Sequence, residues 1–130
     1  MQMFLHGGVA PNGTRLLRAD TIKLMGQNHI GNIHVEQQPT TNPLLSQPFP
    51  LGAGRDTFGL GFQITGAHED RSSRSQGSMS WAGIFNTEFW IDPARGVCGV
   101  LMMQYLPFYD ADAIATLQGF EKRVYDSLGP

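Results

Sequence analysis

Apolar and polar residues alternate through the middle of the chain, which is the pattern of strands with one buried face. Met79 and Trp81 alternate with small residues, and Phe89-Trp90-Ile91 restarts the apolar pattern after a short break. Asp92-Pro93-Ala94-Arg95-Gly96 then supplies a turn, because proline presets φ and glycine tolerates a positive φ. The apolar run 97–103 follows that turn, so the pattern predicts an antiparallel meander over 76–103.

The segments before the meander predict one more strand and a polar tip. Phe58, Leu60, Phe62 and Ile64 alternate with glycine and glutamine, which predicts a strand over 58–64. Residues 66–76 are polar and predict the tip of a hairpin. The run 97–103 is apolar at nearly every position, which is typical of a strand that helices cover on both sides.

A helix is predicted over 111–128. Asp110 follows Pro107 and is suited to cap its N-terminus, and Gly129-Pro130 ends it. Its apolar stripe consists of Ile114, Leu117, Val124, Tyr125 and Leu128.

Two shorter helical segments are predicted near the N-terminus. One covers 19–27, and its N-cap is Arg18, a residue that supplies no capping oxygen. Residues 1–6 have the pattern of the last turn of a helix that ends at Gly7-Gly8. Because so short a helix needs packing, one interpretation is that another segment precedes it, and the other is a frayed start.

Periodicity disappears between residues 29 and 57. Four prolines and then two glycines interrupt this stretch: Pro39, Pro43, Pro48, Pro50, Gly52 and Gly54. The sequence therefore predicts a long irregular loop or arm, a kind of segment that is often functional. We expect it to cross an edge of the sheet or to lie over a partner chain. The whole chain, 1–130, is predicted to be a single α+β domain in which about three or four antiparallel strands pack against the C-terminal helix and short N-terminal helices.

Composition narrows the class of protein. A chain of 130 residues with 41% hydrophobic residues fits one small domain. Its net charge of -2 gives no attraction for nucleic acid or an anionic membrane, and its longest apolar run is too short to span a bilayer. The N-terminus lacks the basic and apolar regions of a signal peptide. We therefore expect a soluble protein, which is cytoplasmic if Met1 is the natural start.

Several residues with reactive side chains are explained better by a structural role than by a chemical one. The single cysteine, Cys98, excludes an internal disulfide, and its apolar neighbours favour a packed thiol. His68-Glu69-Asp70 could contribute to a metal site, but adjacent residues point in different directions, so we predict a solvated loop and no metal or cofactor. His29 and His34 could join a catalytic triad, yet nothing in their spacing supports one, and we interpret them as loop histidines.

One stretch resembles a known family. Ser80-Trp81-Ala82-Gly83, followed by Phe89-Trp90-Ile91-Asp92-Pro93, is similar to the C-terminal part of the serine β-lactamase-like hydrolases. Class C β-lactamases, D-alanyl-D-alanine peptidases and family VIII esterases are members. In that family the strand beside the active site carries Lys-Thr-Gly, His-x-Gly or Trp-x-Gly, and Trp81-Ala82-Gly83 matches the last form. The resemblance extends to 58–62 and 5–25, and so covers most of the chain.

The resemblance implies a partial β-lactamase-like domain in which Trp81, Ala82 and Gly83 form the strand that helps to bind the acyl oxyanion through a backbone N–H. The family often has glycine where Asn86 stands, so this turn departs from the family pattern.

Two motifs of that family are absent from this chain. None of the serines is followed three residues later by lysine, so there is no Ser-x-x-Lys nucleophile motif. None of the tyrosines is followed two residues later by asparagine, so there is no Tyr-x-Asn either. Complete members are also much longer. The resemblance therefore implies the C-terminal portion of a serine hydrolase for β-lactams, peptides or esters, and we expect no hydrolytic activity from this chain alone.

The alternative is a non-catalytic binding or assembly module on the same scaffold. A piece of a larger sheet exposes a strand edge and an apolar face, and such surfaces associate. We therefore expect a homo-oligomer, most simply a symmetric dimer, or association with a missing N-terminal portion.

Overall fold

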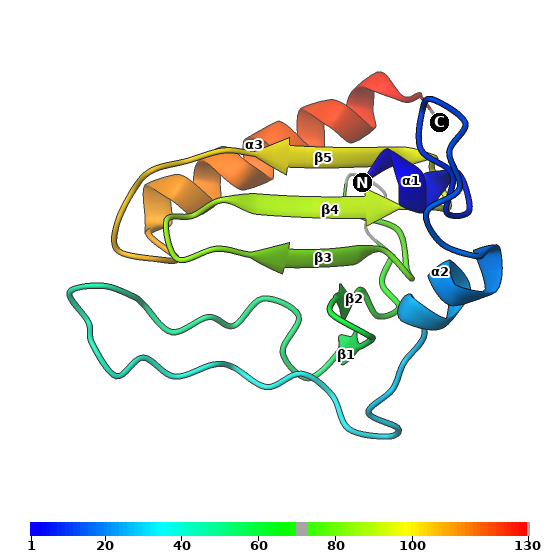
Figure 1. The fold of residues 1–130 in the computed structure, drawn as a ribbon. Coiled ribbons are helices and arrows are strands. Elements are labelled where there is room, and N and C mark those ends of the chain that lie inside the picture. The colour runs from blue at the N-terminus through cyan, green and yellow to red at the C-terminus, as the bar shows by residue number, and fades with distance from the viewer. Residues whose placement is uncertain (70–72, 130) are drawn as a thin grey trace.

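A five-stranded antiparallel sheet forms the centre of the computed structural model, which describes residues 1–69 and 73–129 (Figure 1). The strands lie side by side in chain order. They are β1 (Thr57–Phe58), β2 (Gln63–Ile64), β3 (Met79–Ala82), β4 (Glu88–Asp92) and β5 (Val97–Leu101). The predicted α+β class and the meander over the middle of the chain are confirmed.

Three helices accompany the sheet in the described part of the chain. They are α1 (Gln2–Leu5), α2 (Ala19–Met25) and α3 (Ala111–Ser127). The Asp110 carboxylate caps α3, because it accepts hydrogen bonds from the N–H groups of Asp112 and Ala113. Arg18 is the N-cap of α2 and supplies no side-chain bond, as its side chain predicts.

The prediction of one continuous strand over 58–64 is wrong. The chain turns between β1 and β2, where the Gly59 N–H donates to the Phe62 carbonyl (2.8 Å) and Gly61 has a φ of 91°. A Cβ on Gly59 would lie 2.3 Å from the carbonyl oxygen of Met25, at the end of α2. Contact with α2 therefore requires glycine here, and the turn gives five strands in place of the three or four expected.

Each face of the sheet has its own apolar cluster. On one face Trp90 of β4 is buried against Leu117 and Tyr125 of α3, and Val97 and Leu101 of β5 pack against this cluster. On the other face α1 and α2 cover a second cluster. Its buried members are Phe62, Ile64, Met79 and Ile91. Strand β5 is therefore in contact with helices on both sides, as its apolar sequence predicts.

The irregular arm, residues 29–57, folds back on itself and lies beside β3 (cyan to green in Figure 1). Gln38 and Phe49 exchange two backbone hydrogen bonds of 3.0 and 2.9 Å. The Phe108 backbone anchors the arm, because its N–H donates to the Leu45 carbonyl and its carbonyl accepts from the Gln47 N–H, both at 2.8 Å. The arm therefore crosses the β3 edge and is held by its own chain.

No helix within residues 1–69 and 73–129 has the length and apolar character needed to cross a membrane.

Candidate functional site

The triplet Trp81-Ala82-Gly83 lies at the end of β3. Gly83 begins the turn to β4, where its N–H donates to the Thr87 carbonyl (2.7 Å). Because backbone groups alternate in direction along an antiparallel strand, Ala82 directs its N–H and C=O away from β4. The pairing of β3 with β2 stops at Ser80. Ala82 therefore lies at an edge of β3 that has no partner strand in the sheet.

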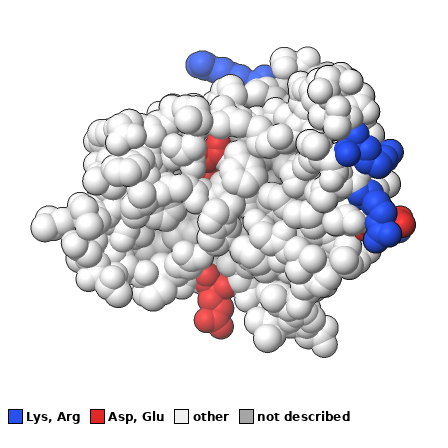
Figure 2. Space-filling model, viewed as in Figure 1, with Lys and Arg blue, Asp and Glu red and all other residues white. Residues whose placement is uncertain are grey.

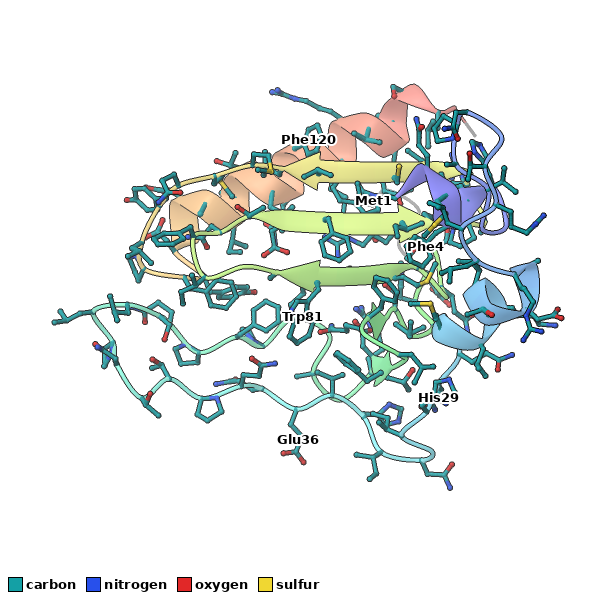
Figure 3. All side chains as sticks on the ribbon, in the orientation of Figure 1. Met1, Phe4, His29, Glu36, Trp81 and Phe120 are labelled. Atoms are coloured by element: carbon teal, nitrogen blue, oxygen red, sulfur yellow. The ribbon has the colours of Figure 1, made fainter. Side chains whose placement is uncertain are left out.

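A cavity of about 250 Å³ opens at this edge. The triplet and Ile84 line one side of it, and the arm and Phe108 line the other. Its arm residues are Gln38, Pro39, Ser46, Gln47 and Phe49. Figure 3 shows Trp81 between the sheet and the arm, and its ring packs edge-on against Phe58 with 5.2 Å between ring centroids. The site therefore combines backbone hydrogen-bonding groups with a small recess.

Asn86 holds the wall of this cavity in place. Its side chain is fully buried, and its Nδ2 donates to the carbonyls of Tyr105 (3.0 Å) and Pro107 (2.9 Å). Its Oδ1 accepts from the Tyr109 N–H (2.8 Å). These bonds fix the segment 105–109 against the turn, and Phe108 in that segment holds the arm. Asn86 thus connects the triplet strand to the opposite side of the cavity.

The φ of Asn86 is 61°, in the left-handed region that glycine also adopts readily. Asparagine and glycine can therefore both adopt the backbone conformation of this turn. Sequence analysis noted Asn86 only as a departure from glycine, and its role in holding 105–109 depends on contacts with distant residues.

Glu88 is a buried carboxyl that sequence analysis missed. It pairs with Ala82 across the β3–β4 ladder, is 2% exposed, and its Oε1 has no hydrogen-bond partner in the described structure. Burial raises the pKa of Glu88 to about 7, while the charge of Arg74 lowers it and that of Glu121 raises it. One signal was present in the sequence, because Glu88 begins an otherwise apolar strand.

The other predicted candidates lie outside this cavity. Cys98 is half-buried and packs against the apolar cluster under α1, in agreement with a packed thiol. His29 and His34 are exposed, and a ring nitrogen of each is hydrogen-bonded to a backbone carbonyl, those of Leu24 (2.8 Å) and Arg55 (3.1 Å) respectively. They are loop histidines, as expected.

The structure describes only part of the segment His68-Glu69-Asp70, which was predicted to be a solvated loop, because Asp70 lies outside the described residues. The Nε2 of His68 lies 2.6 Å from the Arg74 carbonyl. In the described part of the chain, no group of three or more His, Cys, Asp or Glu side chains is placed to hold a metal ion.

Comparison with known proteins finds similar sequences and similar folds. No family model matches it. It is 31% identical over 121 residues to ML-236A carboxylate methylbutanoyltransferase of Penicillium citrinum, covering 87% of this chain and 28% of that protein. It is 26% identical over 148 residues to an uncharacterised protein of Mycobacterium tuberculosis, covering 99% of this chain and 34% of that protein.

Among solved structures, simvastatin synthase from Aspergillus terreus superposes with a TM-score of 0.74 at 23% identity, covering 96% of this chain and 31% of that chain. A mutant of that enzyme superposes with a TM-score of 0.65 at 27% identity. Simvastatin synthase has a β-lactamase-like serine hydrolase fold. That fold is therefore supported for this chain, and the narrower assignment to β-lactamases, peptidases or esterases stays a prediction. The chain spans only 28% to 34% of the length of these proteins.

Proposed function

We propose that this chain is the part of a β-lactamase-like serine hydrolase or acyltransferase that binds the acyl group, and that it is inactive alone. The observation that carries the proposal is the unpaired edge of β3 at Ala82, which opens onto the cavity between the triplet and the arm. Backbone N–H groups that are fixed in a strand stabilise an acyl oxyanion without reorganising during the reaction. Ala82 would supply the backbone donor at this edge, and Trp81 and Gly83 line the cavity beside it.

In this proposal the nucleophile is supplied by another polypeptide segment. The 130 residues contain no Ser-x-x-Lys and no Tyr-x-Asn, so a bound ester or amide would meet donors but no activated serine. The names of two similar proteins, a methylbutanoyltransferase and simvastatin synthase, suggest acyl transfer as the reaction class. A recess of about 250 Å³ suits a group smaller than a drug-sized ligand, such as a short branched acyl group.

Mass spectrometry of the intact chain tests the proposed inactivity. The chain is incubated with a β-lactam and, separately, with a reactive fluorophosphonate. We expect no covalent adduct with either reagent, because no serine is paired with a lysine in the family's arrangement. A stoichiometric adduct on one serine would show that this chain assembles its own nucleophile.

Nuclear magnetic resonance tests the acyl site. The chain has two indole N–H groups, those of Trp81 and Trp90, and Trp81→Phe assigns their signals. Titration with 2-methylbutanoyl-N-acetylcysteamine should shift the Trp81 signal saturably and leave that of the fully buried Trp90 in place. N-acetylcysteamine without the acyl group is the matched control. An unchanged Trp81 signal, or an equal shift with the control compound, argues against an acyl site.

A second candidate function is a non-catalytic assembly module that forms a homodimer. Exposed apolar side chains lie near one end of the sheet, where the Tyr105 N–H donates to the Phe85 carbonyl (3.3 Å). This apolar surface consists of Ile84, Phe85, Met102, Tyr105 and Leu106. Charged side chains are few on the face shown in Figure 2, and most of them lie near its edges. An apolar surface of this kind favours burial against a second copy or a missing N-terminal portion.

Light scattering tests whether the chain forms the homodimer that an assembly module requires. We expect a dimer mass at micromolar concentration, and Met102→Glu should convert it to a monomer because Met102 is 77% exposed on this surface. Leu16→Glu, which changes a 59% exposed leucine in the N-terminal loop, is the matched control. A monomeric mass for the unmodified chain would count against the module.

A further inference from the structure

A second cavity, of about 350 Å³, lies between α3 and lining residues from the segments 51–68 and 73–74, and it shares no lining residue with the cavity at the triplet. Its floor is apolar and consists of Leu51, Ile114 and Leu117. Polar and charged side chains make up most of the remaining wall. This arrangement of an apolar floor and a few fixed polar groups is typical of sites for small molecules.

The polar wall is rigidly built. Asp56 and Gln63 are each 3% exposed, and Arg74 is 7% exposed. The Asp56 carboxylate accepts hydrogen bonds from Arg55 Nε (2.7 Å), Gln63 Nε2 (2.7 Å) and the Gly66 N–H (3.0 Å). Its charge is therefore balanced by protein donors, and it holds the wall together.

Among the side chains that line this cavity, positive charges outnumber negative charges by one. The charged lining residues are Arg55, Arg74 and Lys122, against Asp56 and Glu121, so three positive groups minus two negative groups leaves one positive charge. Arg74 binds Glu121 through its backbone N–H (3.0 Å) and its Nε (3.1 Å). A guanidinium also carries two NH2 groups, which suit a carboxylate.

Lys122 supplies the charge that can turn toward a ligand. Its ammonium pairs with Asp126 at 2.7 Å, and the two side chains are 61% and 54% exposed. Exposed pairs of this kind contribute little free energy, so the ammonium can change partner at low cost. Glu88 does not line the cavity, and burial raises its pKa to about 7, so at pH 6 it is mostly neutral and does not cancel the Arg74 charge.

We infer that this cavity binds a small carboxylate with an apolar body. The carboxylate lies between Arg74 and Lys122, and the apolar body covers the floor of Leu51, Ile114 and Leu117. The inference does not depend on the proposed acyl site, because the two cavities have separate walls.

Calorimetric titration at pH 6 and low salt tests the inference with three probes of one chain length: hexanoate, hexanol and hexylammonium. We expect hexanoate to bind about tenfold more tightly than hexanol, and hexylammonium to show no binding. If hexanol binds as tightly as hexanoate, or hexylammonium binds more tightly, the cavity does not select a carboxylate. Absence of saturable hexanoate binding up to about 10 mM also overturns the inference.

Substitutions at three exposed positions on α3 test whether hexanoate binds in this cavity. Lys122→Gln should weaken hexanoate binding by about threefold to tenfold and leave hexanol unchanged, and Gln118→Glu should do the same because it places a negative charge in the lining. Arg123→Gln removes one positive charge from the same helix at an exposed residue outside the lining, so it is the matched control. An equal loss with Arg123→Gln would mean that net charge alone attracts the probe.

Discussion

Replacing Glu88 by glutamine should stabilise the protein at neutral and alkaline pH. Glu88 is 2% exposed beneath α3, and its Oε1 has no hydrogen-bond partner in the described structure. Burial raises the pKa of this carboxyl from 4.5 to about 7, because the charged form loses its hydration. Glutamine has nearly the same shape and no charge, so the substitution removes the ionisation and keeps the packing.

The direction in which stability changes with pH follows from proton binding. A raised pKa means that the folded state holds the Glu88 proton more tightly than the unfolded state does. The contribution of this proton to the stability of the fold is complete below about pH 4.5, decreases as pH rises, and is lost above about pH 7. A difference of about 2.5 pKa units corresponds to about 3 kcal/mol. Since small domains are stable by roughly 5–15 kcal/mol, this change is a large part of the total.

Urea unfolding followed by far-ultraviolet circular dichroism at pH 4.5 and pH 8 measures the effect. Between pH 4.5 and pH 8, the free energy of unfolding of the unmodified protein should fall by about 3 kcal/mol more than that of Glu88→Gln. Glu36→Gln is the matched control, because Glu36 is exposed on the arm and points away from the sheet (Figure 3). An identical pH dependence in the protein and in Glu88→Gln would refute the reasoning and place the titrating group elsewhere.

Substitutions at three further positions test hydrogen bonding, helix capping and packing, each by urea unfolding. Asn86→Ala should destabilise by about 2–4 kcal/mol, because three hydrogen bonds are lost and alanine disfavours a φ of 61°, whereas Asn86→Gly should cost less; equal losses would contradict the backbone argument. Asp110→Ala should cost about 1 kcal/mol through the lost cap of α3, and no loss would contradict the capping bonds. Gly99→Ala should cost about 1–3 kcal/mol and change the near-ultraviolet signal of Trp90, because a Cβ would lie 2.3 Å from that buried ring; an unchanged signal would show that the ring moves freely.

The candidate acyl site was predictable only in part. Trp81, Ala82 and Gly83 are adjacent in the chain, so a family motif could identify them. The opposite wall consists of arm residues from 38 to 49 and of Phe108, which are far away in the sequence. Asn86 joins the two sides through hydrogen bonds to residues 105–109, and such bonds leave no local pattern.

The sequence by itself determined the features that depend on neighbours along the chain. Alternation predicted the meander, the Asp110 cap predicted the start of α3, and the prolines of 29–57 predicted an arm without helix or strand. Only the tertiary structure decided where distant segments meet. Residue 59 must be glycine because the carbonyl of Met25 lies against it, and Glu88 holds its proton because its burial in the fold excludes water from it. Periodicity and capping act over a few residues, whereas burial and close contact depend on the whole fold.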